Sequence, residues 1–221
     1  MISCKKSDSP ITKVTPVDLD SITANYYEQY LKLYPLDATA QGDERYNDQL
    51  PINIDKDFIS GEITFYNSVQ NQLKKVDYKS LSDQDKTVYD VLDYTLKDKI
   101  ERYAYHPEYI PFTQFSGLPL DFPLLGSGQG NQPFKTEKDY SDWLKRTENF
   151  PAWMDAAIEN FREGITNQYV LPKKLVVKMV TQMNAEEITS SDFSKNIFYG
   201  PINNFPKNFT AAQREKFTKE F

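Results

Sequence analysis

The residue types best suited to covalent or metal chemistry are scarce in this sequence. It holds one cysteine, Cys4, and one histidine, His106, among 221 residues. A disulfide within the chain and a Cys/His zinc cluster are therefore excluded. A Cys–His nucleophile pair would require Cys4 to leave the N-terminal segment. His106 stands directly before Pro107 at the predicted end of a helix, where a helix-terminal role fits better than a ligand or a base.

Cys4 has a more specific interpretation. Met1-Ile2-Ser3-Cys4 resembles the end of a bacterial lipoprotein signal, in which an apolar pair and a small residue precede the cysteine that receives the lipid. The polar run that follows, ending at Pro10, is typical of a flexible tether. We therefore expect residues 1–17 to tether a lipid anchor at Cys4 to the membrane, in the cell envelope, on a periplasmic or outer-membrane surface. The natural start would then lie upstream of Met1. The alternative is a disordered N-terminus that happens to contain a cysteine.

Three other motifs suggest chemistry, and each has a simpler interpretation. The glycine-rich stretch 126–130 follows no predicted strand and lacks the Lys-Ser/Thr of a phosphate-binding loop, so it indicates an elbow. Glu159 and Glu163 share one helix face, as paired carboxylates for acid/base chemistry would, but such a pair is usually a solvated face. Asn208-Phe-Thr210 matches a glycosylation acceptor that a bacterial lipoprotein is not expected to use. We therefore assign no catalytic residue and no metal ligand in this chain.

Composition limits the classes of partner. The net charge is −6 and no long block of basic residues occurs, which argues against nucleic acid as a partner. Aromatic residues make up 14% of the chain, including 15 tyrosines. Tyrosines pack cores and rims, and they also line grooves for sugars and peptides.

The elements that would have to position these residues are mainly helices, because apolar residues recur along the chain with helical periodicity. Three apolar stripes predict three helices before residue 106: one from Asp18 that Pro35 stops, one over 59–76, and one that Ser82 caps. The stretch 36–50 between the first two helices has no sustained hydrophobic period, which predicts a turn-rich connector. Residues 106–133 combine five prolines and four glycines, which excludes helix over most of that length. The many apolar residues of this loop predict that it packs over the helices and walls a cleft.

Helices return after residue 136. Thr136 can cap one with Asp139, prolines 151 and 172 suit the first turns of two more, and Thr210 with Gln213 forms a capping box for the last. Asn196–Asn208 is a second aromatic, proline-containing loop. The sequence thus predicts an all-α fold of helical hairpins with two long loops. We expect residues 18–221 to be the N-terminal portion of a helical domain that is incomplete at its C-terminus.

Several stretches together resemble one family. The segments 33–50 (LYPLDATAQGDERYNDQL), 111–117 (PFTQFSG), 136–183 and 196–206 (NIFYGPINNFP) are similar to the first half of the bacterial "domain of unknown function 885" proteins. The resemblance covers nearly everything from residue 18 onward. It implies an exported protein or lipoprotein with a helical fold similar to zinc metallopeptidases.

The same resemblance implies a zinc site on a His-Glu-x-x-His-like helix in the second half of the domain, and a peptide substrate for the full-length protein. This chain has no such segment, so no catalytic residue can be transferred to it. We expect it to supply the opposite wall of the cleft, with Gln114 and Asp121 of the long loop as candidate substrate-cleft residues. The alternatives are a glycan- or peptide-binding lipoprotein without enzymatic activity and a self-sufficient helical interaction module.

Overall fold

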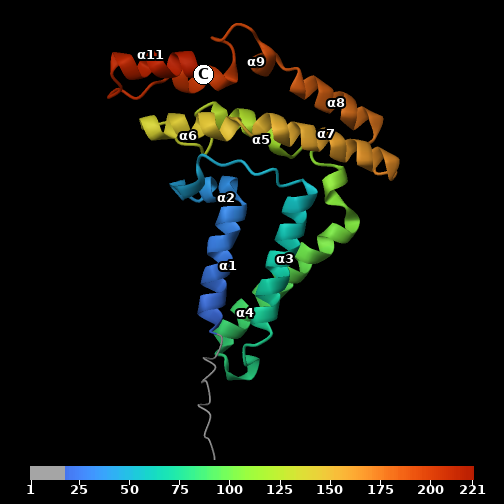
Figure 1. The fold of residues 1–221 in the computed structure, drawn as a ribbon. Helices are drawn as coiled ribbons and strands as arrows, with labels where there is room; N and C mark the ends of the chain where they lie inside the picture. The colour runs from blue at the N-terminus through green and yellow to red at the C-terminus, as the bar shows by residue number, and fades with distance from the viewer. Residues whose placement is uncertain (1–17) are drawn as a thin grey trace, which may run out of the picture.

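The computed structural model describes residues 18–221 and is helical throughout its regular structure, without strands in that range. Cys4 and the expected tether lie outside the described residues. Figure 1 shows three levels: an upright bundle of α1, α3 and α4, a layer of α6, α5 and α7 across its end, and a third level with α8, α9 and α11. The predicted all-α fold is confirmed.

The upright bundle follows the three predicted stripes. Its helices are α1 (Leu19–Leu33), α3 (Lys56–Leu73) and α4 (Asp83–Glu101). Their buried faces form one core, which consists of Leu19, Ile22, Tyr66, Val69, Leu73, Leu92 and Leu96. Ser82 caps α4 as predicted, because its hydroxyl accepts from the Asp85 amide at 3.2 Å.

The predicted connector at 36–50 is more regular than its sequence suggests. Pro35 ends α1, but it also begins the short helix α2 (Pro35–Ala40), and a 3-10 turn follows at Glu44–Tyr46. Proline suits the first turn of a helix because its missing N–H would have no partner there. The first helix thus ends before Pro35 as predicted, whereas the predicted turn-rich connector begins with a short helix.

Most of 106–133 is non-helical as predicted, but two short stretches within it are helical. A 3-10 turn forms at Pro107–Tyr109, and Leu118–Gly126 forms α5 in spite of two prolines. Pro119 occupies the first turn, and Phe122 is buried against the rings of Trp143 and Phe150. Packing thus outweighs a poor local helix propensity.

The expected packing of this loop over the helices is confirmed for part of its apolar set. Phe112, Leu118 and Phe122 are buried in the core of the middle layer. Phe115 and Leu124 instead are 83% and 53% exposed. The loop therefore covers the helices with one face and presents the other to solvent.

The remaining helices lie between residues 137 and 220, and the first and the last of them begin at the capping residues that the sequence predicts. They are α6 (Glu137–Thr147), α7 (Phe150–Thr166), α8 (Lys173–Met183), α9 (Glu186–Thr189), α10 (Gly200–Asn203) and α11 (Ala211–Glu220). Thr136 and Thr210 both form complete capping boxes. The second predicted loop is partly helical, since it contains α10 and a 3-10 turn at Ile197–Tyr199.

The terminal helix packs on the middle layer. Phe217 of α11 is fully buried and its ring lies 4.9 Å from that of Tyr140 on α6. This contact supplies the partner that so short a helix requires. Across 18–221, none of the helices combines the length and the hydropathy that crossing a membrane requires.

Candidate functional site

A pocket lies where the upright bundle meets the middle layer, and Asp121 is part of its wall. We call it the junction pocket. Its volume is about 240 Å³. Its lining comes from the α1–α2 corner, the segment 50–54, the start of α5 and α7, and consists of Leu33, Tyr34, Pro35, Leu36, Asp37, Leu50, Pro51, Asn53, Ile54, Pro111, Gly117, Leu118, Asp121 and Trp153.

The structure separates the two predicted cleft residues. Asp121 lies in the first turn of α5 and lines the junction pocket. Gln114 is buried elsewhere in the same loop, and its backbone carbonyl accepts from the Gln182 side chain of α8 at 3.1 Å. Gln114 therefore joins the loop to α8 and does not line the pocket.

Side chains of α7 fix one wall of the junction pocket. They bond to the segment 50–54, which lies about a hundred residues earlier in the chain. The bonds run from Asn149 Nδ2 to the Leu50 carbonyl (3.2 Å), from Trp153 Nε1 to Asn53 Oδ1 (2.9 Å) and from Asn160 Nδ2 to the Ile54 carbonyl (2.7 Å). The Trp153 indole and the Asn160 amide are buried and need such acceptors, so their bonds set the position of the wall.

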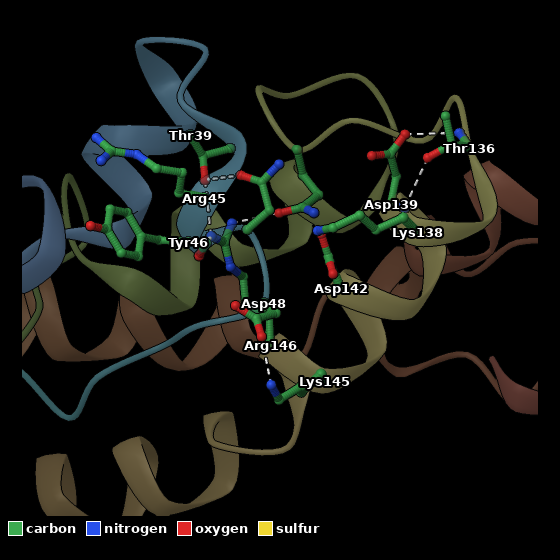
Figure 2. Close-up of polar contacts among 12 residues, drawn as sticks. Thr39, Arg45, Tyr46, Asp48, Thr136, Lys138, Asp139, Asp142, Lys145 and Arg146 are labelled. Carbon is green, nitrogen blue, oxygen red and sulfur yellow. Dashed lines mark hydrogen bonds and ion pairs between the residues drawn. The ribbon is translucent and has the colours of Figure 1, made fainter.

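A buried arginine holds the connector that leads into the same wall. Arg146 of α6 is fully buried (Figure 2). It donates to four acceptors, which are the carbonyls of Gln49 (3.0 Å) and Tyr46 (2.7 Å), Thr39 Oγ1 (2.9 Å) and Gln132 Oε1. All four acceptors are neutral, and burial lowers the pKa of Arg146 to about 10. The planar guanidinium thereby ties α2 and the 3-10 turn to α6.

Charged residues surround this arginine at the surface. Lys145 pairs with Asp48 at 2.5 Å, and Lys138 pairs with Asp142 one turn away (Figure 2). The Lys145 contact holds the pKa of Asp48 below its usual range. The Lys145–Asp48 pair adds a second, weaker link between α6 and the connector, whereas Lys138 and Asp142 both belong to α6.

A buried carboxylate supports the opposite side of the junction pocket. Glu62 of α3 is fully buried and accepts hydroxyl hydrogen bonds from Tyr34, Tyr66 and Tyr103. Arg102 lies 4.0 Å from the same carboxylate. Since Tyr34 also lines the pocket, this cluster determines where its ring can lie.

Carboxylates supply the charge of the junction pocket. Asp37 and Asp121 line it, and no basic residue does. The Tyr30 hydroxyl donates a hydrogen bond to Asp37. Burial raises the pKa of Asp121. The pocket therefore combines apolar walls with two acidic groups, and it holds no nucleophile–base pair.

The zinc implied by the metallopeptidase resemblance does not fit the residues that the structure describes. Within 18–221, His, Cys, Asp and Glu side chains form no group of three or more able to hold a metal. His106 stacks on Tyr109 with the ring centroids 4.7 Å apart, and its Nδ1 lies 2.9 Å from Glu108. We therefore derive no metal-dependent step for this chain.

Two of the other sequence motifs have structural roles in the fold. Glu159 pairs with Arg162 and Glu163 with Lys56, which fits a solvated helix face. Gly126 ends α5 where a side chain would clash with Trp143, because an added Cβ would lie 2.4 Å from the indole ring. The glycine is thus required by close packing.

Sequence reasoning missed the residues that build the pocket walls. Arg146 follows Trp143 on the buried stripe of α6, and Glu62 precedes Tyr66 on the buried stripe of α3. A charged residue on an apolar face is the signal that could have identified both. Trp153 gave no comparable signal, because a tryptophan on a buried stripe is ordinary core.

The comparisons place the chain in a family. The model of the family described as "Bacterial protein of unknown function (DUF885)" matches residues 35–221, far more than half of the chain. No curated protein and no solved structure matches the chain. The match includes the connector, the long loop and every helix from α2 to α11, and therefore all the walls of the junction pocket except its α1 residues. The chain belongs to the bacterial domain of unknown function 885 family.

Proposed function

We propose that this chain is the scaffold and substrate-cleft part of a lipid-anchored cell-envelope protein that acts on peptides and resembles zinc metallopeptidases. In this proposal it binds substrate in the junction pocket and does not perform the chemistry. Cys4 carries the lipid. Catalysis would belong to a metal-holding segment that residues 18–221 do not contain.

The observation that supports this proposal best is the construction of the junction pocket. Its walls come from five segments between residues 33 and 153, and side-chain hydrogen bonds hold three of them in place, namely the α1–α2 corner, the segment 50–54 and α7. Apolar walls with a few convergent polar groups are the usual composition of a ligand site.

Binding experiments test the proposal. We would measure fluorescence anisotropy of labelled pentapeptides with the purified chain, and compare Asp121→Asn with the control Asp155→Asn, an exposed aspartate on α7 that does not line the pocket. We expect saturable binding that Asp121→Asn weakens and Asp155→Asn does not. Absence of peptide binding, or equal effects of both variants, would contradict the proposal. We also expect no zinc-dependent hydrolysis by the chain, and stoichiometric zinc with turnover would overturn that part.

The lipid anchor needs a separate test. Expressed from its natural gene in a bacterial host, the protein should take up labelled palmitate and sediment with membranes. Cys4→Ser should abolish both, whereas Ser7→Ala should change neither. Retention of the label in Cys4→Ser would disprove attachment at Cys4.

One observation favours a second candidate, a glycan-binding lipoprotein without enzymatic activity. Trp153 and Tyr34 line the junction pocket beside the Asn53 amide and two carboxylates. Aromatic rings with polar side chains around them also suit sugar rings. Oligosaccharides included in the same binding assay separate the two functions, because binding of sugars without peptides would select this one.

A further inference from the structure

We propose that the junction pocket selects a cation on an apolar stem, namely the α-ammonium of a peptide or the side chain of a lysine or arginine within it. This inference rests on the proposed peptide-binding function and specifies its substrate. The two carboxylates of the pocket, its lack of a basic lining residue and its apolar walls carry the argument.

The charges in the pocket are not balanced by the protein. Asp121 forms no ion pair within residues 18–221 and is only partly desolvated, so it can receive a ligand from the open side. Asp37 accepts a hydrogen bond from the Tyr30 hydroxyl and forms no ion pair within the described residues. Lys99 lies over the rings of Tyr30 and Tyr34 at 5.9 and 5.8 Å but does not line the pocket.

Asp121 is an exposed residue whose carboxyl is partly desolvated, and this adds a smaller contribution to the preference. Apolar neighbours make the ionised carboxylate costly in the empty pocket, and an ammonium or guanidinium group placed beside it would offset that cost. An acidic or phosphorylated ligand would meet two like charges instead. The pocket thus discriminates by attraction and by repulsion.

The apolar walls of the junction pocket determine which kind of group can carry the cation. Leu50, Leu118 and Trp153 provide an apolar surface that can cover the methylenes of a long side chain. The Tyr34 ring stands at the same pocket and can face a cation. Its hydroxyl already donates to Glu62, so it does not compete for the ligand.

The test uses the whole chain and four peptides that share one apolar sequence. They carry a free or an acetylated N-terminus, combined with a central lysine or its uncharged isostere norleucine. We expect removal of the recognised charge to weaken binding about tenfold or more, because charge-assisted hydrogen bonds are lost. Acetylation and norleucine show separately which of the two cations is recognised.

The Asp121→Asn variant completes the design, with Asp155→Asn as control. Asp121→Asn should weaken binding of the charged peptide about tenfold and leave the uncharged one unchanged. Equal affinity for all four peptides would overturn the cation inference and leave the peptide-binding function intact. Absence of binding by every peptide would overturn both. Stronger binding of the acetylated norleucine peptide would show an apolar pocket and also reject the inference.

Discussion

Tyr34 donates its hydroxyl to the buried carboxylate of Glu62, and so joins the end of α1 to the middle of the bundle. Tyr66 donates to the same oxygen and Tyr103 to the other one. Burial is the main cause that raises the pKa of Tyr103 to about 12, and the hydrogen bond to Glu62 adds to it. One carboxylate thus orients three helices and the ring that lines the junction pocket.

Removal of the Glu62 carboxylate should lower the stability of the fold. Glu62→Ala leaves the hydroxyls of the buried Tyr66 and of the half-buried Tyr34 and Tyr103 without their acceptor, so we expect the free energy of unfolding to fall by about 2 kcal/mol. Urea denaturation monitored by circular dichroism measures it. The matched control is Glu101→Ala, an exposed carboxylate in the last turn of α4. A loss no larger than that of the control would show that the tyrosines find other partners.

Even a conservative replacement of Arg146, on the other side of the pocket, should destabilise the protein. Arg146→Lys keeps the charge but cannot reach four acceptors with one ammonium group, so we expect a loss of about 2–4 kcal/mol in the free energy of unfolding. Arg162→Lys, in an exposed pair with Glu159, should change it by less than about 0.5 kcal/mol. Equal stability of the two variants in thermal denaturation would mean that the connector is not held by the guanidinium.

Tyr140 should make the protein sensitive to alkali. It is fully buried, its hydroxyl donates to the Pro201 carbonyl at 2.8 Å, and burial raises its pKa to about 12. The neutral form is favoured in the folded state, so its contribution is complete below pH 10 and is lost as the pH rises toward 12. Tyr140→Phe should therefore lose less stability than the wild type between pH 9 and 11.

Urea midpoints across this range measure the effect. Arg146 acts with the opposite sign, because its lowered pKa makes stability rise with pH above about 10, but it is present in both proteins and cancels in the comparison. Tyr105→Phe, which changes an exposed ring, should follow the wild type. Parallel curves for Tyr140→Phe and the wild type would reject a role for Tyr140.

The sequence allowed the helices with local signals to be predicted. Ser82, Thr136 and Thr210 each cap a helix in the structure as their spacing indicates, since a cap depends on residues three positions apart. The helix α5 was missed for the opposite reason. Its two prolines count against it locally, and the contacts of Phe122 with Trp143 and Phe150 appear only in the folded chain.

The candidate site was predictable in part. Asp121 lines a pocket, and its assignment to a substrate cleft stays a prediction, whereas Gln114 joins the loop to α8. The polar bonds that shape the pocket connect α6 and α7 with residues about a hundred positions earlier. Hydrophobic periodicity identifies which face of a helix is buried, but it does not identify the partner of a buried polar group.

The side-chain amide of Gln132 has a hydrogen-bond partner for its oxygen but, among the described residues, none for its nitrogen. Arg146 can only donate, so the amide oxygen of Gln132 must face it, and Nε2 is left buried without an acceptor among the described residues. Gln132→Glu replaces that orphan donor with an acceptor and places a negative charge beside a guanidinium that has only neutral partners. We expect the free energy of unfolding at pH 8 to rise by about 1 kcal/mol.

The pH dependence of this gain distinguishes its cause. Arg146 should hold the pKa of the new carboxyl below its usual range, so the gain is present above the ordinary glutamate pKa of about 4.3 and is lost as the pH falls through the lowered value. Gln129→Glu, at an exposed position in the same loop, should leave stability within about 0.5 kcal/mol of the wild type. A destabilised Gln132→Glu would mean that desolvation of the second charge exceeds its attraction to Arg146, and that the neutral acceptors already suffice.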